Sequence, residues 1–193
     1  MTQRDRVIVG ISGASGAAIG MRVVELLADC ATCEVDLIVS PAAARTLNEE
    51  VGAHALPRLH EWATRSHPYA DIGASVASGS FQTAGMIVAP CSMRTLSAIA
   101  GSLADNLLVR AADVQLKERR RLVLLARESP LHLGHLRAMI QATEMGAIIA
   151  PPVPAFYLKP HSLAEVIDHI ARRAINLLAL AETRIAQAEW GQS

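Results

Sequence analysis

Five short apolar segments recur along the chain, and stretches with helical spacing separate them. The segments are residues 7–12, 35–40, 86–90, 122–126 and 147–150. They lack a clear alternation of apolar and polar residues, which is typical of strands covered on both faces. Strands that alternate with helices favour a parallel sheet with right-handed crossovers. The sequence therefore predicts an α/β fold, a Rossmann-like (flavodoxin-like) three-layer sandwich with a parallel sheet.

The last long segment has the pattern of a helix over about residues 162–188. Ser162 is a candidate N-cap, and Glu165 follows three residues later. The apolar residues of this segment exceed one helical stripe, and 51% of the whole chain is hydrophobic. We expect a single domain, 1–193, whose C-terminal helix packs on the sheet and also serves in assembly with neighbouring subunits.

Four prolines lie within residues 150–160, a segment that follows the fifth apolar run. Proline lacks the N–H group that helices and central strands need, so this segment is predicted to be a stiff, extended loop. Loops after strands are where α/β proteins build their sites.

Composition excludes several classes of function. Lys plus Arg number 18, Asp plus Glu number 18, and there are two each of Phe, Trp and Tyr. A chain without net charge and with few stacking side chains lacks the usual features of a nucleic-acid-binding protein. No apolar run reaches the roughly 20 residues that span a bilayer, and the polar first six residues do not resemble an export leader. We therefore expect a cytoplasmic protein that binds neither nucleic acid nor a membrane.

The three cysteines are Cys30, Cys33 and Cys91. An odd number argues against a disulfide framework in a chain with its own large core. Cys30 and Cys33 have the spacing of a redox motif, but they precede a predicted strand, so we interpret them as loop thiols. Zinc would need further ligands, which His132 and His135 could supply only by coincidence, and we expect no metal site.

A glycine-rich turn follows the first apolar segment, with Gly10, Gly13 and Gly16 at three-residue spacing. The following helix would offer unpaired N–H groups to a phosphate or a flavin edge. The spacing differs from that of a dinucleotide fingerprint and of a Walker loop, so a mononucleotide fits better. A glycine turn that serves packing alone remains an alternative.

Small hydroxyl side chains follow three of the predicted strands. Because parallel strands end at one edge, we expect Ser12, Ser15, Ser40, Ser92 and Thr95 to converge there. For each residue separately, helix capping is the more ordinary interpretation.

Two groups of charged residues lie later in the chain. Arg127 and Glu128 come at the end of the fourth apolar segment, where they would form either a structural ion pair or a proton-transfer group. Arg110, Lys117 and residues 119–121 make a basic segment, for which a solvated helix face is the usual explanation.

Together these residues resemble the flavin prenyltransferase (UbiX) family, whose members were earlier described as phenylacrylic acid or aryl decarboxylases. Matching stretches run in family order over nearly the whole chain. They include Pro90-Cys-Ser92, Arg110-Ala-Ala-Asp-Val, Leu116-Lys-Glu-Arg-Arg and Pro154-Ala-Phe-Tyr157.

The resemblance implies a metal-independent enzyme that joins a dimethylallyl group from dimethylallyl phosphate to N5 and C6 of reduced FMN. The product, prenylated FMN, would serve a UbiD-type decarboxylase. The implied FMN-binding residues are Gly13, Ala14, Ser15, Ser40, Glu50, Ser92, Met93, Arg94, Thr95 and Arg127. Those implied for dimethylallyl phosphate are Ser78, Arg110, Lys117, Tyr157 and Arg173. Family members form homododecamers with sites completed by neighbouring subunits, and the same homo-oligomer is implied here.

The chemistry of these residues agrees with such roles. Arg and Lys donors can neutralise a leaving phosphate without a metal. The attacking nitrogen and carbon must lose protons, which suits Glu128 as the catalytic base with Ser15 as its relay; the displaced phosphate is a rival base.

The sequence departs from many family members at Pro41, Arg94 and Ile72. Two other functions stay open: an FMN-binding carrier or partner subunit of an aryl acid decarboxylase, and a flavin-dependent cysteine decarboxylase. A carrier would have no use for a second phosphate site. The cysteine decarboxylases use a His after the second strand, and here His54 and His60 fall nearby without the expected context.

Overall fold

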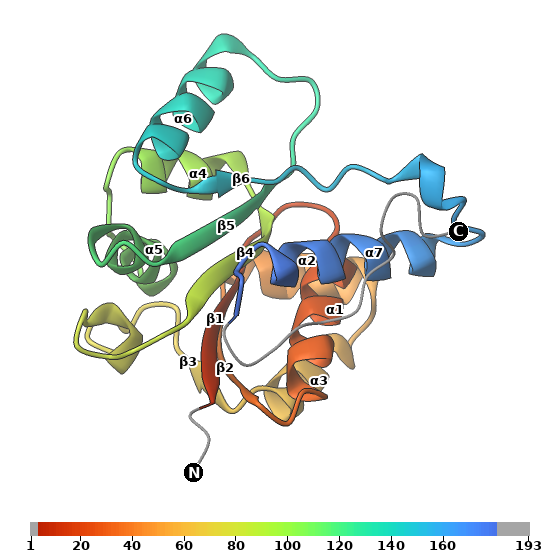
Figure 1. Ribbon diagram of the computed structural model, residues 1–193, viewed down its shortest axis with the longest axis horizontal. Helices are drawn as coiled ribbons and strands as arrows, with labels where there is room; N and C mark the ends of the chain where they lie inside the picture. Colours follow the sequence, from red (N-terminus) through yellow and green to blue (C-terminus); the bar gives the residue numbers. More distant parts are fainter. Residues whose placement is uncertain (1–3, 181–193) are drawn as a thin grey trace.

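The computed structural model describes residues 4–180 and contains one six-stranded parallel sheet in the order β3-β2-β1-β4-β5-β6. The strands are β1 (Asp5–Ile11), β2 (Cys33–Val39), β3 (Arg65–His67), β4 (Gly85–Cys91), β5 (Arg121–Ala126) and β6 (Ile148–Ile149). In this order the chain leaves β1 toward one edge and returns to β4 beside it, as in a doubly wound sheet. The predicted three-layer α/β sandwich is confirmed (Figure 1).

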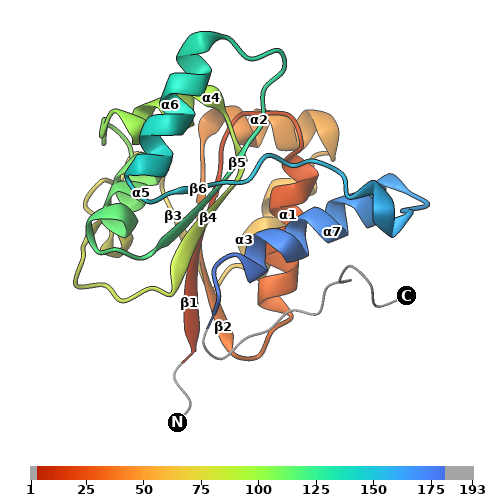
Figure 2. The ribbon, with the colours of Figure 1, turned by 45° about the horizontal axis from the view of Figure 1, so that its top comes forward.

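Helices cover both faces of the sheet, as Figures 1 and 2 show. One face carries α1 (Ala17–Ala28), α2 (Pro41–Glu50), α3 (Ala55–Trp62) and α7 (Leu163–Asn176). The other face carries α4 (Met93–Ala100), α5 (Leu107–Lys117) and α6 (Leu133–Glu144).

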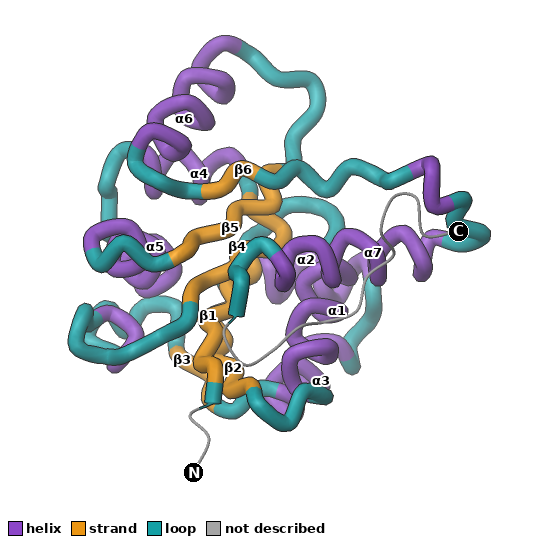
Figure 3. The backbone as a smooth tube through the Cα atoms, in the orientation of Figure 1, coloured by secondary structure: helices purple, strands orange, loops and turns teal. Residues whose placement is uncertain are grey.

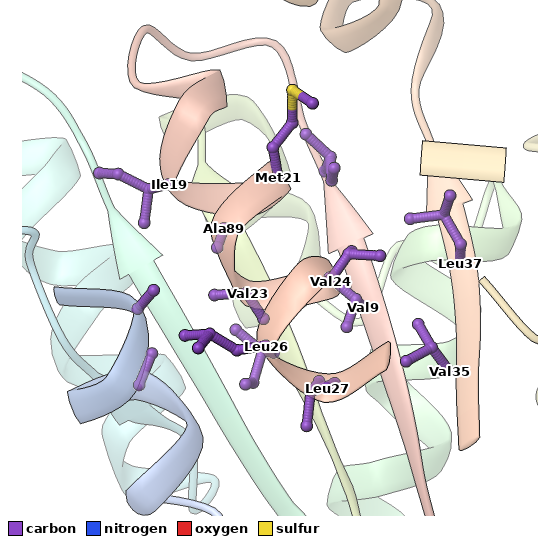
Figure 4. Packing of buried hydrophobic residues seen from close by; sticks show 14 of the residues in the cluster. Val9, Ile19, Met21, Val23, Val24, Leu26, Leu27, Val35, Leu37 and Ala89 are labelled. Atoms are coloured by element: carbon purple, nitrogen blue, oxygen red, sulfur yellow. The ribbon is translucent and has the colours of Figure 1, made fainter. Parts of the chain in front are cut away.

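Two apolar cores result, because successive residues of a strand point to opposite faces. Val9 of β1 belongs to the core under α1 and α7, whereas the neighbouring Ile8 belongs to the core under α4 and α5. Figure 4 shows the first core, in which Val23 and Leu27 of α1 lie against the sheet. Burial on both faces explains why the strands show no alternation of apolar and polar residues.

The structure adds one strand to the five that the sequence predicts. β3 consists of Arg65, Ser66 and His67, which carry no apolar signal, and it pairs with β2 at the sheet edge. The His67 Nε2 atom lies 2.7 Å from Oδ1 of Asp36, a fully buried residue of β2. Polar contacts with the neighbouring strand therefore hold β3 in place, and a search for apolar runs cannot detect them.

The C-terminal helix is shorter than predicted over the described residues. It begins at Leu163 with Ser162 as its N-cap, which accepts the Glu165 N–H at 3.2 Å, as expected. It ends at Asn176, and Ala179 has a positive φ of 49°, a conformation outside the right-handed helix. The prediction for residues 181–188 lies outside the described part of the chain.

The proline-rich segment after β6 forms the predicted loop, interrupted by one 3-10 turn, η2 (Phe156–Leu158). Figure 3 follows this loop from β6 to α7. Across residues 4–180, no helix has the length and apolar character to cross a membrane.

Candidate active site at the C-terminal edge of the sheet

Four loops that follow β1, β2, β4 and β5 meet at the C-terminal edge of the sheet. Ser12 joins two of them: its hydroxyl donates to the Pro90 carbonyl at 2.9 Å and accepts the Ser92 N–H at 2.7 Å. Ser40 N donates to the Ile11 carbonyl at 3.0 Å, which ties the second loop to the first. The predicted convergence of the residues after these strands is therefore present in the structure.

Ser40 and Ser92 both act as helix N-caps, as the ordinary interpretation of each residue predicts. The Ser40 Oγ atom accepts the Ala43 N–H at 3.1 Å, and the Ser92 Oγ atom accepts the Thr95 N–H at 3.3 Å. Pro41 occupies the first turn of α2, where a missing N–H costs nothing. This departure from the family pattern thus fits the fold.

The structure favours glycine at positions 13 and 16 for two different reasons. A Cβ atom on Gly13 would overlap the Cβ of Ala42 in α2, so a side chain would push the first loop away from α2. Gly16 has a φ of 101°, which glycine adopts without strain, and it is the N-cap of α1. Ala14 is buried and its N–H donates to the Ser12 carbonyl at 2.9 Å. The glycine turn therefore serves packing as well as access to the edge.

Glu50 occupies the position at the N-terminus of α1 that we expected a phosphate or a flavin edge to take. Its carboxylate accepts the N–H groups of Gly16 and Ala17, both at 2.9 Å, and hydrogen-bonds to the Ser15 hydroxyl. Burial raises the pKa of Glu50, but these hydrogen bonds and the charge of Arg127 outweigh burial, and the pKa lies below its usual value. The expectation for these N–H groups was wrong, because the chain supplies its own anion to the helix.

Arg127 and Glu128 do not form the structural ion pair that was one of the two interpretations of the sequence. The charge of Arg127 acts on Glu50, while the Glu128 carboxylate accepts the N–H of Ser129 at 3.0 Å. Both side chains are exposed. In this structure the Ser15 hydroxyl hydrogen-bonds to Glu50, and the expected relay between Ser15 and Glu128 stays a prediction.

The first turn of α4 contains Met93, Arg94 and Thr95. Met93 and Thr95 are buried, whereas the guanidinium of Arg94 donates to the exposed Asp105 carboxylate at 2.9 Å. The Arg94 side chain is directed to Asp105, so only the backbone of Arg94 lies in the first turn of α4 near the end of β4. The other departure from the family, Ile72, is 55% exposed.

Tyr157 and Arg173 lie together in a pocket of about 160 Å³ next to the end of β5. The proline-rich loop and α7 line the pocket, and most of its lining is apolar, including Leu125, Ala150 and Ile170. His169 also lines this pocket, although it is not among the site residues predicted from the sequence. It lies four residues before Arg173 in a helix, and this spacing, which puts both side chains on one face, could have indicated it. An apolar pocket with one guanidinium and one phenol suits an apolar group that carries an anion.

The other three residues implied for dimethylallyl phosphate lie elsewhere. Lys117 ends α5 and Ser78 precedes β4, so both lie toward the N-terminal edge of the sheet. Lys117 forms an ion pair with Glu118, and Arg110, two turns earlier on α5, pairs with Asp113 at 2.8 Å. Within one subunit, the residues implied for dimethylallyl phosphate are therefore divided between the two ends of the sheet strands.

The residues at the C-terminal edge suit a flavin mononucleotide better than a metal ion. They provide hydroxyl groups, backbone N–H groups at the start of α4 and the guanidinium of Arg127, beside the small residues Gly13 and Ala14. Among residues 4–180, no three His, Cys, Asp or Glu side chains gather as they would around a metal ion. Cys91, which ends β4, is fully buried, and burial raises the pKa of its thiol far above the usual value.

The fold and this edge define a flavoprotein, and comparison with known proteins agrees: the chain belongs to the Flavoprotein family, which matches residues 1–172. Within it, the chain is a member of the flavin prenyltransferase UbiX family. It is 51% identical to flavin prenyltransferase UbiX of Escherichia coli (strain K12), over 96% of this chain and 97% of the relative. It is 53% identical to that of Thauera aromatica, over 89% and 87%. The resemblance seen in the sequence is thereby confirmed.

Two solved structures are also close to this chain. The crystal structure of AnUbiX in complex with FMN and dimethylallyl pyrophosphate has a TM-score of 0.88 and 44% identity, covering 92% of this chain and 94% of that one. A dodecameric FMN-dependent UbiX-like decarboxylase from Escherichia coli O157:H7 has a TM-score of 0.88 and 40% identity, covering 91% and 95%. An FMN-dependent cysteine decarboxylase shares only 14% identity, which shows a common fold alone.

Proposed function

We propose that this chain joins a dimethylallyl group from dimethylallyl phosphate to N5 and C6 of reduced FMN, without a metal. The prenylated FMN would serve a UbiD-type decarboxylase in the cytoplasm. The observation that carries the proposal is the Tyr157–Arg173 pocket, which is also lined by Leu125 of β5, the strand that the loop of Arg127 follows. A protein that only stores a flavin has no need of a second anion site there.

The FMN would be held by residues of the four loops. Ser15, Ser40 and the first turn of α4 offer hydroxyl and N–H donors, and the Arg127 guanidinium offers a positive charge. When bound, reduced FMN supplies the nucleophilic N5 and C6 atoms. Gly13 and Ala14 keep this side of the edge free of bulky side chains.

Arg173 and Tyr157 would bind the allyl phosphate from one side, while apolar residues such as Leu125 and Ile170 surround its hydrocarbon part. Cleavage of the carbon–oxygen bond places negative charge on the leaving phosphate, which guanidinium and phenol donors stabilise. An aliphatic lining also excludes water from the allyl group.

Lys117, Ser78 and Arg110 would complete the phosphate site from a second copy of the chain, because they lie away from Arg173 in one subunit. This arrangement supports a homo-oligomer, and the dodecameric relative supports a dodecamer. We propose that the chain forms one flavoprotein domain whose C-terminal helix, beginning with α7, takes part in that assembly.

Proton removal from the reacting flavin is best supported for Ser15 and Glu50. The Ser15 hydroxyl hydrogen-bonds to a carboxylate whose pKa lies below its usual value, so the carboxylate is charged at neutral pH. A charged carboxylate behind a hydroxyl forms a relay that accepts a proton. Glu128 remains a candidate for a second proton transfer from its exposed position beside Arg127.

The test is anaerobic incubation of the purified protein with reduced FMN and dimethylallyl phosphate, followed by mass spectrometry of the released flavin and activation of a cofactor-free UbiD-type decarboxylase. Prenylated flavin that activates the partner supports the proposal. Lys117→Ala and Arg173→Ala should abolish transfer while FMN stays bound. Unmodified flavin on a wild-type protein that binds FMN tightly would favour the carrier instead.

A further inference from the structure

The loop of residues 78–80 lies against the end of α5. The Oγ atoms of Ser78 and Ser80 are 2.9 Å apart, and both residues are exposed. A Cβ atom on Gly79 would lie 2.6 Å from the Lys117 Nζ atom, so the loop touches the lysine where glycine leaves room. Two hydroxyls and one ammonium group therefore gather at one surface.

An anionic oxygen already occupies this place. The Glu118 Oε1 atom lies within the space that a side chain on Gly79 would take, next to Lys117. The loop thus accommodates a negatively charged oxygen beside the ammonium group.

The guanidinium of Arg120 donates hydrogen bonds to the backbone of this loop. Its two terminal nitrogens donate to the Gly79 carbonyl at 2.7 Å and the Phe81 carbonyl at 2.8 Å, with a longer bond to Thr83 Oγ1 at 3.3 Å. The side chain is half-buried, unlike that of a solvated basic helix face. A planar guanidinium can fix two carbonyls at once, which a lysine cannot do.

Arg120 is itself attached to the helix that carries Lys117. Its N–H donates to the Gln115 carbonyl at 2.9 Å, across a turn in which Arg119 has a φ of 58°. The Thr83 hydroxyl donates to Oε1 of the fully buried Gln115 at 2.8 Å. The distance between the loop and Lys117 is thus set through Arg120.

We propose that Arg120 is a positioning residue for the anion subsite: it holds Ser78 and Ser80 against Lys117, so that these three groups meet the phosphate of the allyl substrate. This inference rests on the proposed function, which assigns Ser78 and Lys117 to that phosphate. Arg120 acts through the loop and does not touch the substrate, because its guanidinium donors serve the loop carbonyls.

The test measures kcat and KM for dimethylallyl phosphate, together with FMN affinity and thermal stability, in the full-length assembly. Arg120→Gln should raise KM by roughly tenfold, a factor that corresponds to the loss of one good contact, with unchanged FMN affinity. Arg120→Lys keeps the charge and should not restore KM. Arg121→Gln is the matched control, because the Arg121 guanidinium donates to the Leu177 carbonyl at 2.9 Å and not to the loop.

A double variant separates positioning from general stability. If Arg120 acts through the loop, Arg120→Gln adds little to the KM of Ser78→Ala. If the increases in KM caused by the two substitutions multiply instead, the two residues act independently and the proposal is overturned. An unchanged KM in Arg120→Lys would also overturn it. Arg120→Lys therefore provides the test if Arg120→Gln fails to fold. A wild-type protein that makes no prenylated flavin would overturn the proposed function and this inference together, whereas a wild-type KM for dimethylallyl phosphate in an active Arg120→Lys variant overturns the inference alone.

Discussion

The Ser15 hydroxyl hydrogen-bonds to the Glu50 carboxylate, which also caps the N-terminus of α1. The two residues are 35 positions apart and come from the first loop and the last turn of α2. One carboxylate therefore both stabilises a helix and faces the edge where the flavin is proposed to bind.

Glu50→Gln should slow prenyl transfer and lower stability at neutral pH, because the amide carries no charge for the helix or for proton transfer. The folded-state pKa of Glu50 is below its unfolded value near 4.5, so its contribution to stability is present above that pH. The stability gap between wild type and variant should shrink as pH falls below about 4.5. Urea denaturation at several pH values measures this.

The neighbouring Glu49→Gln is the control for that experiment. Glu49 pairs with Arg45 at 2.8 Å one turn earlier on the exposed side of α2, so its loss should change neither turnover nor the pH profile. Equal effects of the two variants would mean that Glu50 has no special role.

Gly13→Ala should destabilise the protein by about 1–3 kcal/mol, since its Cβ would overlap that of Ala42 and the loop would have to shift. FMN affinity should fall with it, because the same loop carries Ser15. Gly73→Ala is the control: the nearest atom to its Cβ is 3.6 Å away, and we expect a change within about 0.5 kcal/mol. Similar midpoints for both variants in urea would contradict the packing argument.

The sequence predicts the layers well because apolar runs and helical spacing record burial directly. The segments expected at 86–90 and 122–126 lie inside β4 and β5. Hydroxyl residues after strands also indicate the edge that carries the site, since parallel strands end together.

Contacts between distant residues are harder to predict. The local sequence pattern does not indicate that Glu50 accepts hydrogen bonds at the start of α1. Nor does it indicate that Arg120 donates hydrogen bonds to a loop about 40 residues earlier. Similarly, Lys117 and Arg173 look like partners in a family pattern, but one chain carries them at different edges. Local patterns report the faces of an element, whereas these relationships depend on how the elements are packed.

We predict that polar contacts stabilise the edge strand β3. His67→Leu removes the 2.7 Å contact to the buried Asp36 and should destabilise the protein by about 1–3 kcal/mol. Arg65→Gln, which removes a longer 3.5 Å contact to the same carboxylate from a side chain that is 42% exposed, should cost less than about 1 kcal/mol. The reverse order in urea denaturation would show that His67 does not hold the strand.

Glu118→Gln should strengthen binding of the allyl phosphate. The Glu118 carboxylate forms an ion pair with Lys117 and lies over Gly79, so it competes with a phosphate for the same ammonium group. Neutralising it should lower KM for dimethylallyl phosphate a few-fold, with FMN affinity unchanged. Both groups are exposed, so added salt weakens their attraction and the advantage of the variant should decrease as ionic strength rises. A KM that rises in the variant would instead mean that Glu118 holds Lys117 in its working position.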